Sequence, residues 1–420
     1  MSPTRTLPAV VTGVLISLAL VSCSATSPMP VPPRPSATST VVLSGDGVLR
    51  IGTLFPGTGA QSYLGDGQAA GVAVAVKEIN DDGGVLGKPV EVLARDSGDV
   101  TTATIEASIA DLVSAKADVL IGPSSSVLAE RVIPKIVAAK LPMISPAATS
   151  VRLSSTASHG YFFRTIGSSA LEGNALAQAI GGGKARIAIV YFDDDLGRAV
   201  LGTMRAALAA SGGLVSAQKI TAATTDPAPI VATVKASTPD DVVFVSPFSA
   251  MEQNKGMIIQ LAAAGFGGAK LWLTSQNTAD YSQALPVGTL TNVNGMLEGA
   301  RPTATFVARV AAVAPAVTDL LYAEEAYDAV ILAALAATVA KDANGTAIAA
   351  RLREVSAGGI ECTTYRECVN VLKTSSNIDY DGISGATSFD ANGDTGPAHF
   401  GLYRYDAEGR FARVSDLIAR

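Results

Sequence analysis

Residues Val119–Ser145 read VLIGPSSSVLAERVIPKIVAAKLPMIS, in which two apolar runs of strand length flank a helical pattern. The first run, Val119–Ile121, meets a turn at Gly122-Pro123. Residues 126–139 repeat apolar side chains at helical spacing, and Met143–Ser145 is the second run. A strand, a helix and another strand in this order predict a βαβ unit with parallel strands.

The same alternation extends in both directions and restarts after Gly167. We therefore expect two successive α/β halves, each a Rossmann-like lobe in which helices flank a parallel sheet. The strands are expected at 48–55, 89–94, 119–121, 143–145, 186–192, 242–246 and 270–274, and the helices at 66–80, 101–115, 126–139, 171–179, 197–210, 253–264 and 323–340.

The end of the chain, residues 383–417, changes to strand-like segments. They surround Asp390-Ala391-Asn392-Gly393-Asp394, where Asn-Gly predicts a tight hairpin turn. A calcium loop is the alternative for this acidic stretch. It is disfavoured because Thr395 occupies the sixth position, where an EF-hand requires glycine.

Composition excludes several classes of protein. The 420 residues are 48% hydrophobic and 16% charged, which is too apolar for a disordered chain. Lys+Arg number 31 against 37 Asp+Glu, so the net charge is −6 and no basic patch is available for nucleic acid. The two histidines argue against a histidine-ligated metal site and against a Ser-His-Asp triad.

Motifs for cofactors and catalysis are also missing. The chain contains no Walker A loop, no tight dinucleotide-binding fingerprint and no Gly-x-Ser-x-Gly elbow. Asp193-Asp194-Asp195 could bind a cation, but a helix cap is the commoner role for such a run. We therefore expect no cofactor and no metal, and we do not expect an enzyme.

Residues 1–22 have the pattern of a signal peptide. The apolar run Leu7–Val21 follows Arg5 and is too short to span about 30 Å of hydrocarbon. It ends in Leu20-Val21-Ser22-Cys23, which resembles a bacterial lipobox, so we expect Cys23 to be lipidated. The alternative is an ordinary secretory signal with an incidental cysteine.

Residues 23–47 are rich in Ser, Thr and Pro and are expected to form a flexible tether. The folded part would then be lipid-anchored on the extracellular face of the cell membrane, or periplasmic if an outer membrane is present. In such an oxidising compartment Cys362 and Cys368, six positions apart, are expected to form a disulfide. A metal site would need more ligands than this region contains.

Two loops follow neighbouring predicted strands at one edge of the sheet. Residues 122–126 are Gly-Pro-Ser-Ser-Ser, and residues 145–149 are Ser-Pro-Ala-Ala-Thr. Backbone N–H groups and hydroxyls at a helix N-terminus suit a carboxylate or another anion. Ordinary helix capping is the alternative for either loop alone.

These segments, with others in the same order, resemble the leucine/isoleucine/valine-binding protein family, the type I periplasmic binding proteins of ABC importers. The resemblance runs from about residue 49 to 405. It rests on Ile51-Gly52, Gly65-Asp66-Gly67, 75–84 (AVKEINDDGG), 121–126 (IGPSSS), 142–149 (PMISPAAT), 163–165 (FRT), 187–197 (IAIVYFDDDLG), 326–330 (AYDAV) and 379–385 (DYDGISG).

The resemblance implies two lobes joined by three crossings, near Thr165, Gly295 and Asp379. Lobe 1 would comprise 49–166 and 296–378, and lobe 2 would comprise 167–295 and 379–420. The ligand would bind in the cleft between the lobes, which close on it as a clamshell, and the closed form would dock on a membrane permease.

The resemblance also implies the site residues. Ser126 and Thr149 match positions that hold a ligand carboxylate, Ala147 offers a carbonyl to an ammonium, and Tyr63 lies over the ligand. We use the name carboxylate cradle for Ser125, Ser126 and Ala147–Thr149. The full set of expected ligand-binding residues is Tyr63, Ser125, Ser126, Ala147, Ala148, Thr149, Leu196, Phe248 and Gln276.

Three of these residues depart from the family pattern. Leu196 and Phe248 stand where tyrosine is usual, and Gln276 stands where amino-acid binders place an acidic residue. A neutral amide cannot make the charge-assisted bond to an ammonium, which is worth roughly 1.5–3 kcal/mol. Glu324 or Glu325 could supply the missing anion instead.

The function implied is a lipid-anchored receptor that captures a small amino acid, or a related carboxylate or amide, for an ABC importer of the amino-acid transport type. A ligand-sensing lipoprotein without a transporter is the first alternative, and an extracellular enzyme is the second. The sequence leaves the identity of the ligand and of the permease open.

Overall fold

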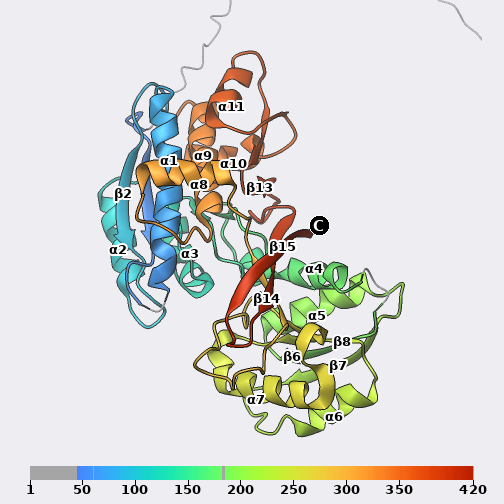
Figure 1. Cartoon of the computed structure of the whole chain (residues 1–420). Coiled ribbons are helices and arrows are strands. Elements are labelled where there is room, and N and C mark those ends of the chain that lie inside the picture. Colours follow the sequence, from blue (N-terminus) through green and yellow to red (C-terminus); the bar gives the residue numbers. More distant parts are fainter. Residues whose placement is uncertain (1–44, 60, 182–184, 420) are drawn as a thin grey trace, which may run out of the picture. The chain divides into compact units, whose positions relative to one another are not determined.

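The first sheet contains five parallel strands in the order β2-β1-β3-β4-β5. Its edge strand β2 is labelled in Figure 1. The computed structural model describes residues 45–59, 61–181 and 185–419. The strands of this sheet are β1 (Arg50–Phe55), β2 (Glu91–Asp96), β3 (Val119–Ile121), β4 (Met143–Ser145) and β5 (Phe162–Arg164).

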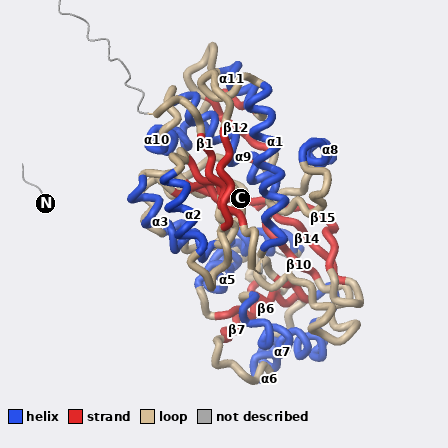
Figure 2. The backbone as a smooth tube through the Cα atoms, turned by 90° about the vertical axis from the view of Figure 1, so that its left-hand side faces the viewer, coloured by secondary structure: helices blue, strands red, loops and turns tan. Residues whose placement is uncertain are grey.

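Alternate residues of these strands enter two different cores, as expected for a sheet covered on both faces. In β3, Val119 and Ile121 pack on one face and Leu120 on the other. Helices α2 and α3 cover the second face, and α1 and α9 cover the first (Figure 2). The helices around this sheet are α1 (Gly65–Asp81), α2 (Thr104–Ser114), α3 (Ser126–Ala139), α8 (Ala304–Val313), α9 (Ala323–Ala340) and α10 (Gly345–Val355).

The second sheet contains seven strands in the order β15-β14-β10-β9-β8-β6-β7. Strands β6, β7, β8, β9 and β10 are parallel to one another. At one edge, β14 pairs antiparallel with β10, and β15 pairs antiparallel with β14. The strands are β6 (Ile187–Phe192), β7 (Leu214–Ile220), β8 (Asp241–Val245), β9 (Leu271–Leu273), β10 (Asn294–Glu298), β14 (Ala398–Tyr405) and β15 (Phe411–Ala419), and the helices are α4 (Glu172–Ala179), α5 (Asp195–Ala207), α6 (Ala228–Ala236) and α7 (Met251–Leu261).

A small third sheet, β11-β12-β13, joins the first core. Cys362 in β11 is disulfide-bonded to Cys368 in α11, which confirms that expectation. Tyr380 of β12 is buried and donates its hydroxyl hydrogen to Asp328 of α9 at 2.7 Å. These elements are β11 (Ile360–Cys362), α11 (Tyr365–Val371), β12 (Ile378–Gly382) and β13 (Gly385–Ala386). The short helical turns are η1 (Ser62–Leu64), η2 (Leu153–Ser155), η3 (Ser169–Leu171), η5 (Phe248–Ala250), η6 (Ala262–Phe266) and η7 (Gly268–Lys270).

The chain passes between the first and second sheets three times. The connecting segments are 165–171, after β5, then 299–303, after β10, and 387–397, before β14. We name them the first, second and third crossing. Strand β10 pairs with β9 and β14, so residues 294–298 belong to the second sheet.

The predicted α/β class, with sheets flanked by helices, is confirmed. The second sheet is mixed rather than wholly parallel because of β14 and β15. The hairpin expected at residues 390–394 is wrong, since β14 and β15 are joined at Asp406–Arg410. The Asn-Gly segment does form a turn, but its Gly393 carbonyl accepts the N–H of Arg164 and the turn joins no pair of adjacent strands.

The predicted signal peptide, the lipidation site Cys23 and nearly all of the tether lie outside the described residues. Among the residues that are described, no helix combines the length and apolarity needed to cross a bilayer.

Candidate functional site

The loop after β3 approaches β1 closely. Gly122 has a φ of +115°, and a Cβ at this position would lie 2.4 Å from the carbonyl oxygen of Leu54. Only glycine fits this conformation and this contact. Further along the loop, the Ser124 hydroxyl donates to the side-chain oxygen of Gln68 on α1 at 2.9 Å. The loop is therefore fixed before it reaches the start of α3.

The two serines at the start of α3 have different roles. Ser125 is the N-cap residue, and its Oγ accepts the N–H of Leu128 at 3.5 Å. Ser126 begins the helix, and its Oγ accepts the N–H of Ser150 at 3.1 Å. The capping alternative therefore describes Ser125, whereas Ser126 connects the two halves of the carboxylate cradle and keeps a hydroxyl hydrogen to donate.

The loop after β4 is built on Ser145. Its hydroxyl donates to the carbonyl of Pro123 at 2.6 Å and accepts the N–H of Ala148 at 3.0 Å. The Ala147 N–H also points to this oxygen, at 3.4 Å. Ser145 thus binds both loops, and the cradle segments lie together as the sequence suggested.

Thr149 has a backbone N–H and a hydroxyl that make no hydrogen bond with the described residues. Its carbonyl accepts the N–H of Ser169 at 2.9 Å, and the carbonyls of Ala148 and Ser150 accept from Arg164. Among the described residues, neither the N–H nor the hydroxyl of Thr149 has a partner, and the Ala147 carbonyl is likewise unoccupied. Two donors beside one acceptor suit a carboxylate next to an ammonium.

The remaining expected site residues also follow the carboxyl ends of parallel strands, where α/β sheets bind ligands. Tyr63 follows β1 and is 61% exposed, and Phe248 follows β8 and is 57% exposed. Leu196 lies at the start of α5 and is partly buried against the core of the second sheet. Gln276 is exposed in the loop after β9. Across the described residues, none of these four side chains is hydrogen-bonded to the cradle.

The structure uses Glu324 and Glu325, the suggested substitutes for Gln276, to hold the second crossing. Glu325 Oε1 accepts the N–H of Ala300 at 2.8 Å, and Glu324 Oε1 accepts that of Thr303 at 3.1 Å. Both side chains are buried, and burial raises the pKa of Glu324 to about 7 and that of Glu325 to about 8. Each carboxyl therefore already has a backbone partner.

Sequence reasoning missed two buried acids, Glu172 and Glu298, which accept hydrogen bonds from Ser275 and Ser169. Ser275, the neighbour of Gln276, donates its N–H to Glu172 Oε1 at 2.6 Å and its hydroxyl hydrogen to Oε2 at 3.1 Å. Ser169, whose N–H binds Thr149, donates its hydroxyl hydrogen to Glu298 at 2.7 Å. Burial raises the pKa of both carboxyls, and the charge of Glu298 adds to the effect at Glu172.

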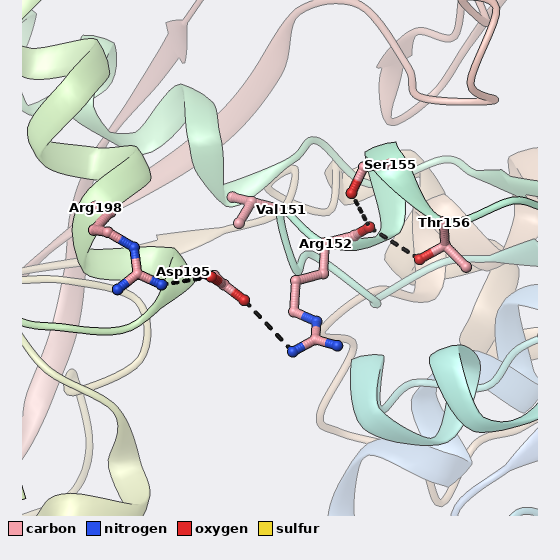
Figure 3. A pocket seen from close by; sticks show the side chains of 6 residues that line it. All are labelled: Val151, Arg152, Ser155, Thr156, Asp195 and Arg198. Atoms are coloured by element: carbon pink, nitrogen blue, oxygen red, sulfur yellow. Dashed lines mark hydrogen bonds and ion pairs between the residues drawn. The ribbon is translucent and has the colours of Figure 1, made fainter.

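A polar pocket of about 440 Å³ lies next to the cradle (Figure 3). Arg152 contacts Asp195 there, with Nη1 3.5 Å from Oδ2, so the loop that carries Thr149 meets the helix that carries Leu196. The pocket is lined by Val151, Arg152, Ser155, Thr156, Asp195 and Arg198. Sequence inspection gave no signal for this pair, because its members are far apart in the chain.

The three carboxylates of the Asp193–Asp195 run all have partners within the protein. Asp194 caps α5 by accepting the N–H of Gly197 at 2.8 Å. Asp193 pairs with Arg198 and Lys219, while Asp195 pairs with Arg198 and Arg152. The capping role therefore holds for Asp194, and the other two carboxylates are engaged by cations of the protein itself.

Comparisons with known proteins place this geometry in a family. The sequence profile of a family described as periplasmic binding protein matches residues 48–409. No curated protein matches the chain.

Solved structures share the fold. One is the branched-chain amino acid transporter substrate binding protein LivJ of Streptococcus pneumoniae in complex with isoleucine, 21% identical with a TM-score of 0.61, covering 88% of this chain and 99% of that chain. Another is an ABC transporter substrate-binding protein of Desulfitobacterium hafniense in complex with Leu, 20% identical with a TM-score of 0.63, covering 87% and 100%. A third is a solute binding protein of an ABC transporter of Rhodopseudomonas palustris in complex with p-hydroxybenzoic acid, 18% identical with a TM-score of 0.61, covering 89% and 98%.

The profile spans the first sheet, all strands of the second sheet except β15, and all three crossings. The chain therefore belongs to the periplasmic binding protein family, and its resemblance to the type I, leucine/isoleucine/valine-binding members is confirmed.

Proposed function

We propose that this protein is a lipid-anchored receptor that captures a small amino acid, or a related carboxylate or amide, for an ABC importer. The observation that carries the proposal is the set of unoccupied groups in the carboxylate cradle. Among the described residues, Thr149 keeps an N–H and a hydroxyl without a partner, and Ala147 keeps a carbonyl, while the Ser145 hydroxyl and the Ala148 carbonyl of the same loop are bonded. Such a loop has donors and an acceptor ready for a ligand without further rearrangement.

The lobes of the receptor correspond to the two large sheets. We propose lobe 1 around the first sheet and lobe 2 around the second, joined by the three crossings. The second crossing then lies at 299–303, a few residues beyond Gly295, and the third at 387–397, which begins eight residues beyond Asp379. This assignment is supported by the pairing of β10 with β14 and by the burial of Tyr380 in the first core.

In this proposal the ligand carboxylate binds Thr149 and Ser126, at the N-terminus of α3, where the helix dipole favours an anion. An ammonium, where the ligand has one, binds the Ala147 carbonyl. Gln276 would face it with a neutral amide, so an amino acid would be held less tightly than by a site with an acid at that position.

An aromatic carboxylate is the second candidate ligand. Tyr63 and Phe248 follow strands of different sheets, and both rings are more than half exposed. Exposed aromatic rings gain free energy when they stack on a flat apolar ligand. Such a ligand lacks an ammonium, so the neutral Gln276 would cost it nothing. The related fold that was solved with p-hydroxybenzoic acid agrees with this choice.

Anchoring and transport rest on the N-terminal sequence. Cys23 would carry the lipid, residues 23–47 would be the tether, and an ABC permease would be the membrane partner. A Cys23→Ala variant expressed in the native host should lose incorporation of labelled palmitate and leave the membrane fraction. Retention of the label on this variant would rule out Cys23 as the anchor. A ligand-sensing lipoprotein remains the alternative, and it predicts that deletion of the gene leaves ligand uptake unchanged.

The ligand itself is found by a thermal-shift screen of residues 24–420 without lipid. The panel contains branched-chain and other amino acids, short amides, urea, aromatic carboxylates and sugars. A binder present at about 100 times its Kd adds about 2.7 kcal/mol of stability, which gives a clear shift in Tm. Shifts with amino acids or carboxylates support the proposal, and shifts with sugars alone would contradict it.

A further inference from the structure

Arg164, the last residue of β5, is completely buried, and each of its three guanidinium nitrogens donates at least one hydrogen bond. Nη1 donates to the carbonyls of Ala148 at 3.1 Å and Ser150 at 2.9 Å. Nη2 donates to the Ser154 hydroxyl at 2.8 Å, and Nε donates to Asp394 Oδ1 at 2.7 Å. A buried cation with a paired anion is costly to disturb, because removing one partner leaves an uncompensated charge, so these contacts hold their positions in the fold.

The contacts on one side of the guanidinium hold the cradle. Ala148 and Ser150 are the residues on either side of Thr149, so a single nitrogen atom binds the two carbonyls that flank the proposed anion donor. Ser169 binds the Thr149 carbonyl between them. With three successive carbonyls fixed, the orientation of the Thr149 N–H is set by Arg164 and the first crossing.

The contact on the other side reaches the third crossing. Asp394 ends the turn whose Asp390 Oδ1 accepts the N–H groups of Asn392 at 2.7 Å and Asp394 at 3.0 Å. The Gly393 carbonyl accepts the Arg164 N–H at 3.0 Å. Gly393 has a φ of +84°, and a Cβ there would lie 2.2 Å from the Phe162 carbonyl, so this turn is seated directly against β5.

We propose that Arg164 is a positioning residue that fixes the Thr149 loop and the third crossing, through Asp394, as one mechanical unit. The proposal rests on the proposed function in one respect, namely that the cradle is the ligand site and that the crossings are its hinges. It assigns a role to the Asp390–Asp394 turn, which is neither a strand hairpin nor part of the cradle. A change at the crossing then alters the cradle, although within the described part of the chain Asp394 has no hydrogen bond or ion pair with a cradle residue.

Guanidinium geometry is essential to this role. Arginine presents five donors in a rigid planar fork, whereas lysine has one ammonium that cannot reach two carbonyls and a carboxylate in different directions. Arg164→Lys keeps the charge and should lose the link. Asp394→Asn keeps an oxygen acceptor for Nε and removes only the charge, so it is the milder change.

The test is hydrogen exchange of the ligand-free protein, read by mass spectrometry on peptides that cover 146–152 and 390–397. In Asp394→Asn, exchange should be at least about fivefold faster in both segments. Ser154→Ala is the matched control, because it removes another partner of the same guanidinium and, among the described residues, the Ser154 hydroxyl is hydrogen-bonded only to Arg164. In this control, exchange in both segments should stay within about twofold of the wild type.

Faster exchange in 390–397 with unchanged exchange in 146–152 would overturn the proposal. So would equal acceleration of both segments in Ser154→Ala, because that would show general loosening of the structure rather than a specific link. The two variants are compared at matched distances below their own Tm. The result does not depend on ligand, so it is decided separately from the thermal-shift screen that tests the proposed function.

Discussion

The Oγ of Ser126 accepts the N–H of Ser150 at 3.1 Å, and this one bond joins the first turn of α3 to the loop that carries Thr149. The two segments come from the ends of adjacent strands β3 and β4. Because the two segments are joined, the positive end of the α3 dipole lies beside the N–H and hydroxyl of Thr149. The anion-binding chemistry of the cradle thus arises from two pieces of chain that the sheet holds together.

The first prediction concerns the Thr149 hydroxyl. Thr149→Val keeps the side-chain shape and removes one donor to a carboxylate, so affinity for any carboxylate ligand should fall about tenfold or more, since a bond to a charged group is worth roughly 1.5–3 kcal/mol. Isothermal titration with the compound that gives the largest shift in the screen measures this. Thr156→Val is the control, because Thr156 lines the neighbouring pocket and binds the Arg152 carbonyl. If Thr149→Val and Thr156→Val bound the ligand with equal affinity, the Thr149 hydroxyl would not be a ligand contact.

The second prediction concerns Gln276. The side chain is exposed, so an added negative charge is tolerated in the ligand-free protein. Gln276→Glu should strengthen binding of amino acids by about tenfold or more through a charge-assisted bond to the ammonium. It should not strengthen binding of benzoate, which has no ammonium, and benzoate is therefore the internal control. If Gln276→Glu gained nothing with any amino acid, this interpretation of the residue should be dropped.

Much of this architecture is visible in the sequence, because periodicity reports which side chains face a core. The segments expected at 119–121, 126–139, 143–145 and 323–340 coincide with β3, α3, β4 and α9. The hairpin of β14 and β15 was harder to predict from the sequence, because its turn at Asp406–Arg410 lacks the Asn-Gly pair that is present at residues 392–393. The local turn signal predicted a hairpin at residues 390–394, whereas the strands that pair are joined at Asp406–Arg410.

The polar interior behind the cradle could not be anticipated in the same way. Arg164 and Asp394 are 230 positions apart, and Ser275 and Glu172 are 103 apart. No periodic pattern links such residues, because only the closed fold makes them neighbours. Glu172 resembled an ordinary acidic residue in the first turn of a helix, and nothing around it in the sequence indicated complete burial.

The third prediction concerns the disulfide. Both sulfur-bearing residues are buried beneath the β11–α11 connection, and their Cα atoms are 5.2 Å apart. Replacing both with alanine opens a short loop, and the chain-entropy relation predicts a loss of about 2 kcal/mol in the free energy of unfolding. Urea unfolding measures the loss, and the wild type in reductant should match the variant. Equal stabilities with and without the bond would contradict the estimate.

The last prediction is a fall in stability at alkaline pH that is caused by the second crossing. Burial raises the pKa of Glu325 to about 8 and that of Glu324 to about 7, well above the usual value for an exposed glutamate. Between the unfolded and folded pKa values, the native state binds more protons than the unfolded state. Stability is therefore present at low pH and is lost as pH rises through each folded pKa.

The effect is measured between pH 6.5 and 8.5 as the difference in slope between the wild type and a variant, because other groups titrate in the same window. Burial raises the pKa of Asp118 to about 7, and His399, whose folded pKa is lowered by burial, still loses its proton there in the unfolded state. Within the window, each buried carboxyl lowers the free energy of unfolding by up to about 1.4 kcal/mol per pH unit until it ionises. Glu325→Gln keeps an oxygen for the Ala300 N–H and should flatten the slope. Glu252→Gln, whose side chain is 85% exposed, should leave it unchanged. A Glu325→Gln protein with the same slope as the wild type would show that Glu325 is already ionised in the native state at pH 6.5.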